Sequence, residues 1–258
     1  MNILIGDIGN TKTKICLIDY KTTKIIKVLY FDSIKIKSLF FIKNILKKFF
    51  YKKKIVRTAL FSSVVPEYYL TLKKVLKKNY KIKLFEIKEK MIKKIIKINI
   101  KNKKQVGSDR IANAVGAYKK YKSNCIVLDF GTATTFDVVM VNGSYNGGII
   151  APGVNLSIKS LTDSADQIPK FSIAKQKKII GKNTLEALRS GFYWGYSGLI
   201  NNIIFKIEKE TKKKYKIIFT GGYAHLFKTS IMRPFKIDRN ITIKGIIEIF
   251  KENKKYLY

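Results

Sequence analysis

Two short segments combine acidic and hydroxyl side chains with a glycine, a set of groups that can bind a phosphate and its accompanying cation. One is Asp129-Phe-Gly-Thr-Ala-Thr-Thr-Phe-Asp137, which lies between the apolar runs Cys125–Leu128 and Val138–Val141. Short β-branched runs of this kind predict strands, so the segment between them is predicted to be a hairpin turn. Gly131 lets the backbone approach a ligand closely. Exposed N–H groups and hydroxyls suit phosphate, and a carboxylate at the rim suits a cation.

The same pattern occurs near the N-terminus. An apolar run ends at Asp7, Gly9 follows in the turn, and a second apolar run ends at Asp19. Asp7 corresponds to Asp129 and Gly9 to Gly131. Two copies of one element, roughly half the chain apart, predict a duplicated fold with a cleft between two related halves. The alternative is a pair of unrelated hairpins with glycine turns.

The composition indicates a globular protein that stays in the cytoplasm. The chain has 258 residues, 46% of them hydrophobic, which is enough for one large or two small domains. It has no uncharged apolar run that could span a bilayer, and the N-terminus enters a strand without a signal peptide, so we expect no membrane association. Cys16 and Cys125 lie in strand patterns and are predicted to be reduced and buried. The one histidine, His225, is predicted to be an ordinary surface or packing residue.

The formal net charge of +36 suggests nucleic-acid binding at first sight. Base-specific recognition favours arginine, however, and a dedicated binding face would concentrate the charge. Only five of the 53 basic residues are arginine, and the lysines are spread over nearly every segment. We therefore predict no specific nucleic-acid partner and attribute the lysine excess to genome composition. Loose binding to polyanions at low salt is expected in either case.

Apolar periodicity and turn residues predict alternating strands and helices. Strands are expected at 25–31, 56–65, 82–85 and 217–222, and helices at 39–50, from Pro66, at 110–118, from about Asn155, from Asn183 and at 246–250. The basic helix at 39–50 would suit a membrane surface, but a core-facing helix with a solvated face fits better. Residues 163–182 are expected to form a loop, and residues 86–104 show no clear pattern. The boundary between halves is placed within 119–123.

Together the motifs resemble those of type III pantothenate kinases, a family in the superfamily of acetate and sugar kinases, Hsp70 and actin. The matching segments are Asp7-Ile-Gly-Asn-Thr11, Ser62-Ser-Val-Val-Pro66, Gly107-Ser-Asp-Arg-Ile-Ala-Asn-Ala114, Asp129-Phe-Gly-Thr-Ala-Thr-Thr-Phe-Asp137, Gly147-Gly-Ile-Ile-Ala-Pro-Gly153, Asn183-Thr184 with Gly191, and Thr220-Gly-Gly222. They fall in the expected order. The resemblance implies an α/β fold of two ribonuclease-H-like (actin-like ATPase) halves with a cleft between them. The halves would be residues 1–121 and 122–258, the second with the contacts of a homodimer.

The resemblance also implies an activity. It is the ATP-dependent phosphorylation of pantothenate to 4'-phosphopantothenate, the first step of coenzyme A biosynthesis, with magnesium and with potassium or ammonium. Asp129 matches the monovalent-cation ligand, and Asp7 would hold magnesium through water. The implied ATP-binding residues are Asp7, Ile8, Gly9, Asn10, Thr11, Lys12, Thr13, Lys14 and Thr132. A P-loop motif does not occur in the sequence.

The hydroxyl nucleophile needs a base, and with His225 as the one imidazole a carboxylate must serve. Asp109 matches the family's catalytic base; its alternative role is to cap the helix at 110–118. The implied substrate contacts are Gly107, Ser108, Asp109, Arg110 and Thr184. Arg110 could bind the carboxylate of pantothenate in a bidentate manner.

Two positions depart from the family pattern. The family usually carries Tyr-x-Asn-Pro before Gly-x-Asp-Arg, whereas this chain has Ile100-Lys-Asn102-Lys103, and Tyr223 stands where an acidic or polar residue is usual. An alternative reading is a non-catalytic, nucleotide-binding accessory factor for transcription. Intact Asp7, Asp109 and Asp129 favour the kinase. An actin- or Hsp70-like ATPase is disfavoured because the chain is too short for their insertions.

Overall fold

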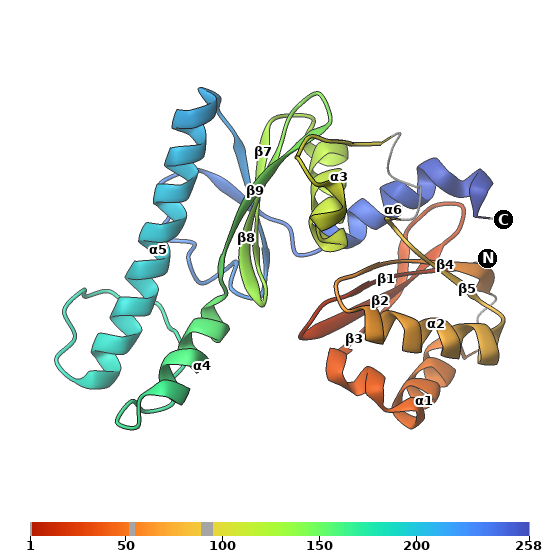
Figure 1. Cartoon of the computed structure of the whole chain (residues 1–258), viewed down its shortest axis with the longest axis horizontal. Coiled ribbons are helices and arrows are strands. Elements are labelled where there is room, and N and C mark those ends of the chain that lie inside the picture. Colours follow the sequence, from red (N-terminus) through yellow and green to blue (C-terminus); the bar gives the residue numbers. More distant parts are fainter. Residues whose placement is uncertain (1, 52–54, 89–94, 258) are drawn as a thin grey trace. The chain divides into compact units, whose positions relative to one another are not determined.

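The computed structural model describes residues 2–51, 55–88 and 95–257, which divide into two compact units (Figure 1). Unit 1 comprises residues 1–120, 143–145 and 240–258, and unit 2 comprises residues 121–142 and 146–239. The first crossing lies one residue from the predicted boundary. The predicted second half nevertheless needs correction, because its C-terminal segment belongs to unit 1, where helix α6 (Ile241–Asn253) contacts the first sheet.

The sheet of unit 1 has five strands in the order β3-β2-β1-β4-β5. They are β1 (Asn2–Ile8), β2 (Lys12–Asp19), β3 (Ile25–Asp32), β4 (Ile55–Ser63) and β5 (Lys83–Glu86). The first three strands pair antiparallel, because short turns connect them, and β4 and β5 are parallel to β1. The β2–β3 turn is fixed by Asp19, whose Oδ1 accepts hydrogen bonds from the backbone N–H groups of Lys21 and Thr22.

Helices cover both faces of this sheet. Helix α1 (Leu39–Phe50) is capped by Ser38, whose hydroxyl accepts from Phe41 N–H, and α2 (Pro66–Tyr80) has proline in its first turn. Both helices pack on the face that carries Leu4 and Ile8 (Figure 1). The predicted burial of the apolar side of the 39–50 helix is thus confirmed. Ile3 and Ile5 alternate to the opposite face, where α6 packs.

Helix α3 (Ser108–Tyr121) crosses α6 at two glycines. A Cβ atom at Gly245 would overlap the carbonyl oxygen of Ala112, and one at Gly116 would overlap that of Ile241. This close crossing attaches the C-terminal helix to the helix that begins at Ser108. The remaining short elements of unit 1 are β6 (Lys97–Ile98) and the 3-10 helices Ser33–Lys37, Lys103–Gln105 and Lys254–Tyr256. Of the segment without a predicted pattern, residues 89–94 lie outside the described residues.

The main sheet of unit 2 repeats the topology of unit 1. Its strand order is β11-β10-β7-β8-β9, built from β7 (Cys125–Phe130), β8 (Ala133–Val139), β9 (Ser144–Pro152), β10 (Lys216–Gly221) and β11 (Phe235–Ile237). Strands β7 and β8 are antiparallel, and β10 and β11 are parallel to β7. Strand β6 pairs with residues 144–145 of β9, which are counted with unit 1. The matching order confirms the predicted pair of ribonuclease-H-like halves.

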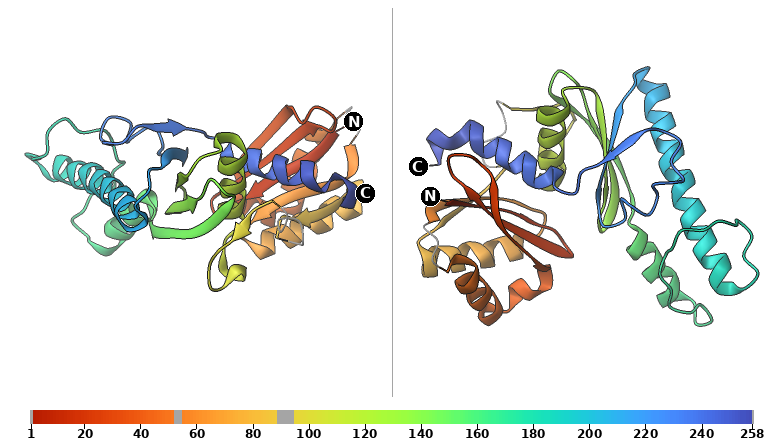
Figure 2. Two further views of the ribbon diagram at one scale, coloured as in Figure 1. Left: turned by 90° about the horizontal axis from the view of Figure 1, so that it is seen from above. Right: turned by 180° about the vertical axis from the view of Figure 1, so that it is seen from behind.

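Two helices belong to unit 2, and both contribute to the core on one face of its sheet. They are α4 (Val154–Ser164) and the long α5 (Thr184–Thr211), which runs along that face (Figure 2). The core joins Ile126, Leu128 and Phe219 to Tyr193 and Ile200 of α5. Among the described residues, no helix combines the length and the apolar character that a membrane span requires.

Candidate active site

Asp7 lies at the carboxyl end of β1, where a tight turn leads into β2. In the sheet its neighbours are Lys14 of β2 and Ser62 of β4. The N–H of Gly9 donates to the carbonyl oxygen of Lys12 at 3.1 Å, and a Cβ at Gly9 would stand 3.0 Å from that oxygen. The turn is therefore closed tightly, and its tip is left exposed.

Asp129 occupies the equivalent place in unit 2. It lies near the carboxyl end of β7, between Thr135 of β8 and Thr220 of β10. The following turn is closed in the same way, because Gly131 N–H donates to the carbonyl oxygen of Ala133 at 3.1 Å. The duplication seen in the sequence therefore extends to the register of the strands.

Glycine residues lie close to the Asp129 carboxylate and to the turn that follows it. Gly221 has φ +84°, and a Cβ there would stand 2.7 Å from Asp129 Oδ1. Gly222 N–H donates to the carbonyl oxygen of Phe130 at 3.1 Å. A Cβ at Gly153 would overlap the backbone carbonyls of the Gly131 turn. In the sequence these glycines belong to separate motifs, and their position at strand ends is the signal that they could meet at the Asp129 turn.

Ser108 brings the start of α3 to the edge of the first sheet. Its hydroxyl donates to the carbonyl oxygen of Ser63 at 2.7 Å and accepts from Ser63 N–H at 2.8 Å. Ser62, which is the neighbour of Asp7 in the sheet, also lies within hydrogen-bond distance, with 3.3 Å between the two hydroxyl oxygens. Asp109 follows Ser108 directly. Unit 1 thus brings Asp7 and Asp109 to the same edge of one sheet, although 102 positions separate them in the chain.

Asp109 lies inside the first turn of α3 rather than at its cap. The helix begins at Ser108, and the residue before it is Gly107, whose carbonyl accepts from Ile111 N–H at 3.1 Å. Asp109, the alternative cap considered for this helix, therefore does not precede it. A Cβ at Gly107 would overlap Asp109 Oδ1, so this carboxylate position requires glycine there.

Burial raises the pKa of the Asp109 carboxyl above the ordinary value near 3.8. A hydrogen bond from Arg110 N–H to Oδ1, at 2.8 Å, and the charges of Arg110 and Lys88 lower this pKa but do not cancel the effect of burial. A carboxylate with a raised pKa accepts a proton more readily, as a general base must.

Arg110 is half-buried in the next position of the same turn. Its guanidinium carbon lies 5.9 Å from the centre of the Tyr145 ring, a residue that is fully buried. A cation held over an aromatic face has a restricted orientation. The side chain is therefore positioned as well as charged.

Among the other predicted ATP-binding residues, some side chains are buried and others are exposed. Ile8 is in the hydrophobic core, and Thr13 is buried with its hydroxyl 2.8 Å from that of Ser33, so neither side chain faces solvent. The Lys14 ammonium donates to the side-chain oxygen of Asn240, the residue before α6. Lys12 is exposed and forms an ion pair with Asp32 at 2.5 Å. Asn10 and Thr11 are exposed at the tip of the turn.

The predicted residues of unit 2 are all at the ends of elements. Thr132 is exposed at the tip of the β7–β8 turn, and Thr184 is exposed as the first residue of α5. The cap of α5 is Asn183, which accepts from Glu186 N–H at 2.9 Å and donates to the Glu186 carboxylate at 3.0 Å. Thr184 is thus left clear of the capping bonds.

In the described part of the chain, no three histidine, cysteine or acidic side chains gather as a metal cluster. Cys16 and Cys125 are free and buried, as predicted, and burial raises the pKa of the Cys16 thiol to about 11. His225 is exposed. A cation in either unit would therefore need oxygen ligands from the backbone, water or a substrate beside one carboxylate.

Two sheets of the same strand order, each with an aspartate before the equivalent turn, define a fold of two ribonuclease-H-like halves. Solved structures agree at the level of the fold. A protein assigned to the Baf family of transcriptional activators, from Campylobacter jejuni, aligns with a TM-score of 0.63 and 21% identity over 98% of this chain and 99% of its own. An inorganic polyphosphate/ATP-glucomannokinase from Arthrobacter sp. strain KM aligns with a TM-score of 0.51 and 11% identity over 97% and 99%.

Sequence comparison identifies the family. Residues 3–206 match the family described as type III pantothenate kinase. A type III pantothenate kinase of Pelagibacter ubique is 50% identical over 95% of this chain and 97% of its own length. One from Paramagnetospirillum magneticum is 37% identical over 76% and 75%. The chain belongs to the type III pantothenate kinases, as the motifs predicted.

Proposed function

We propose that the chain transfers the terminal phosphoryl group of ATP to the primary hydroxyl of pantothenate, with Asp109 as the general base. The observation that carries this proposal is the position of Asp109. It is a half-buried carboxylate with a raised pKa, held at the sheet edge that also carries Asp7. Phosphoryl transfer requires positioning and charge stabilisation more than covalent help. The base accepts the hydroxyl proton as the oxygen bonds to phosphorus.

The substrate carboxylate is the natural partner of Arg110. A guanidinium can bind a carboxylate through two parallel hydrogen bonds, and its position over Tyr145 limits the orientations it can adopt. Asp109 and Arg110 are consecutive residues in the first turn of α3. One helix terminus would thus bind the substrate carboxylate and supply the base for the substrate hydroxyl.

Both implied cations fit the residues present. Magnesium bound to ATP phosphates supplies charge neutralisation, and Asp7, half-buried at its turn, would hold it through water. A monovalent cation prefers several oxygen ligands. The Asp129 carboxylate with nearby backbone carbonyls, which the surrounding glycines leave uncovered, offers such a set. Asp129 would hold the cation, and the exposed tip of the Gly131–Thr132 turn would face the phosphate groups.

The test is ADP release in magnesium buffer, with and without pantothenate, in potassium or sodium chloride. We expect release that requires pantothenate and is faster in potassium. The Asp129→Ala variant should fold normally and lose the difference between the two salts, because its carboxylate is the charged ligand. ADP release that does not depend on pantothenate in either salt would refute the proposed reaction. A salt dependence in Asp129→Ala equal to that of the unaltered protein would refute only the cation site.

We also propose a homodimer that forms through one face of α5. Gly191, Gly195, Gly198, Asn202 and Phe205 recur at helical spacing and are all exposed. A Cβ at any of the three glycines would meet nothing within 4 Å, and Phe205 is 51% exposed. A smooth stripe that ends in an exposed aromatic ring allows two helices to approach closely.

Large side chains in this stripe should therefore separate the subunits. The Gly195→Leu/Gly198→Leu variant is expected to shift the mass in light scattering from twice 29.7 kDa to 29.7 kDa. Leucine raises helix propensity relative to glycine, so the variant should stay folded. Lys159→Leu, on the exposed side of α4, is the matched control and should remain dimeric. A dimer that survives the double substitution would place the contact elsewhere.

A further inference from the structure

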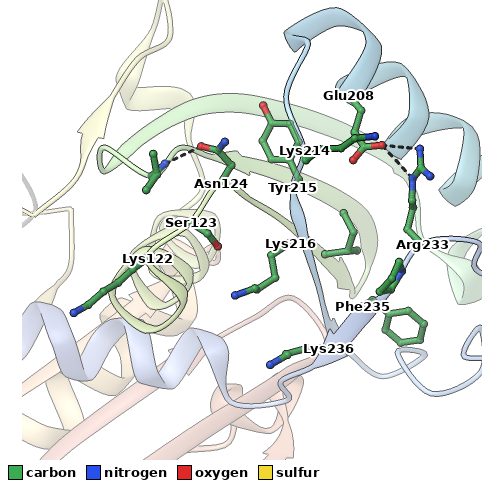
Figure 3. Close-up of a pocket in the computed structure, with 13 residues that line it drawn as sticks. Lys122, Ser123, Asn124, Glu208, Lys214, Tyr215, Lys216, Arg233, Phe235 and Lys236 are labelled. Carbon is green, nitrogen blue, oxygen red and sulfur yellow. Dashed lines mark hydrogen bonds and ion pairs between the residues drawn. The ribbon is translucent and has the colours of Figure 1, made fainter.

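A cavity lies in unit 2, at the opposite end of the strands from Asp129. It has a volume of about 710 Å³ and opens between the amino-terminal ends of β7, β10 and β11 (Figure 3). Asp129 lies four residues along β7 from Cys125, the first residue of that strand. At roughly 3.3 Å per residue the two ends are about 13 Å apart along the strand. The cavity is thus separate from the carboxylate and its glycines.

Basic side chains dominate the lining, and we refer to this cavity as the basic pocket. Its charged residues are Lys122, Lys214, Lys216, Lys236, Arg233 and Glu208. Arg233 and Glu208 neutralise each other, with the carboxylate 3.1 Å from Nε and 2.9 Å from an Nη of the guanidinium. In the described part of the chain, none of the four lysines has a carboxylate partner.

The strand register places two of these lysines together. Lys236 of β11 pairs with Ile218 of β10, and Ile218 is two residues from Lys216. Because side chains alternate along a strand, Lys216 and Lys236 lie on the same face of the sheet. Figure 3 shows both side chains extending in the same direction, with Lys122 on that side as well. Lys216 also lies 5.4 Å from the centre of the Tyr121 ring.

Neighbouring ammonium groups without counter-charges repel one another, and an anion that bridges them removes this repulsion. Lysine is a compact point charge that suits phosphate oxygens. The volume is within the range of small-molecule sites, and the consecutive residues Pro234 and Phe235 add an apolar wall. We propose that the basic pocket binds a small ligand with two or more linked phosphate groups. The ligand is either an inorganic phosphate chain or a nucleotide, whose base the apolar wall would contact.

The experiment uses the full-length protein with its ATP site saturated by a non-hydrolysable ATP analogue. Tripolyphosphate and ADP are titrated separately, and binding is followed by amide chemical shifts. We expect tripolyphosphate to shift the amides of residues 122–124, 214–217 and 233–236. In Lys216→Gln/Lys236→Gln the affinity for tripolyphosphate should fall about tenfold or more. The affinity of the unaltered protein should fall as the salt concentration is raised. A stronger response to ADP would identify a nucleotide as the preferred ligand.

The control removes the same charge elsewhere in unit 2. Lys159→Gln/Lys170→Gln changes two exposed lysines outside the basic pocket and should leave the affinity within about twofold. Equal weakening in both double variants would show that only the overall charge attracts phosphate, and would overturn the proposal. Shifts confined to the Gly9 or Gly131 turns, or no shifts at all, would overturn it as well.

Discussion

Asp109→Asn is expected to lower kcat by about 10²- to 10⁴-fold, the usual contribution of a general base. The substitution keeps the shape of the side chain and its acceptor for Arg110 N–H, so KM for pantothenate should change little. Measurement of kcat and KM for both substrates separates a role in chemistry from one in binding. Asp166→Asn, an exposed aspartate in unit 2, is the matched control and should keep full activity.

The raised pKa of Asp109 supplies a second readout. Because activity needs the charged carboxylate, kcat/KM should fall on the acid side at a pH above the ordinary aspartate value near 3.8.

The folding stability should change with pH in the opposite direction to the activity. The folded protein holds the proton of the Asp109 carboxyl more tightly than the unfolded chain does. The contribution of Asp109 to stability therefore decreases as the pH rises from the ordinary aspartate pKa near 3.8 through the raised pKa of the folded protein. Asparagine removes that penalty, and the variant should melt no lower than the wild type at pH 7.

These readouts distinguish the base from a structural residue. If Asp109 only held the start of α3 in place, its replacement would lower the melting temperature of the protein together with its activity. Loss of activity with retained stability is the result that supports the base. An Asp109→Asn enzyme with kcat within about threefold of wild type would contradict the proposed role, because removal of a general base costs far more.

Gly245→Ala is expected to be the most damaging small substitution in unit 1. Its methyl group would overlap the carbonyl oxygen of Ala112 in α3, and backbone atoms cannot rotate away as a flexible side chain can. Overpacking of this kind costs about 1–3 kcal/mol in the free energy of unfolding. Thermal unfolding should therefore begin earlier, by roughly 2–4 °C for each kcal/mol in a chain of this size.

Activity should also fall in Gly245→Ala, because α3 carries Asp109 and Arg110 in its first turn. Lys251→Ala, on the exposed side of α6, is the control and should change the unfolding free energy by less than about 0.5 kcal/mol. If both variants melted together with the wild type, the α3–α6 crossing would not be as tight as described.

The sequence alone predicted most of the helices and strands, though not β6 or β11, and it identified the family. The Asp-x-Gly turns at Asp7 and Asp129 are local signals, since glycine and neighbouring polar side chains specify a turn without distant contacts. The same holds for the helices at 39–50 and from Pro66, whose apolar spacing and first-turn residues are local. The order of these motifs along the chain then indicated the duplicated fold and the resemblance to type III pantothenate kinases.

Only the tertiary structure decided which of these residues meet. The hydrogen bonds of Ser108 to Ser63 place Asp109 at the sheet edge of Asp7, and no spacing in the chain predicts a contact over such a separation. The same is true of Gly153 and Gly221 beside the Asp129 turn, and of Gly245 against Ala112. The C-terminal helix joined unit 1 for the same reason, because close packing between distant segments depends on three-dimensional fit rather than on local pattern.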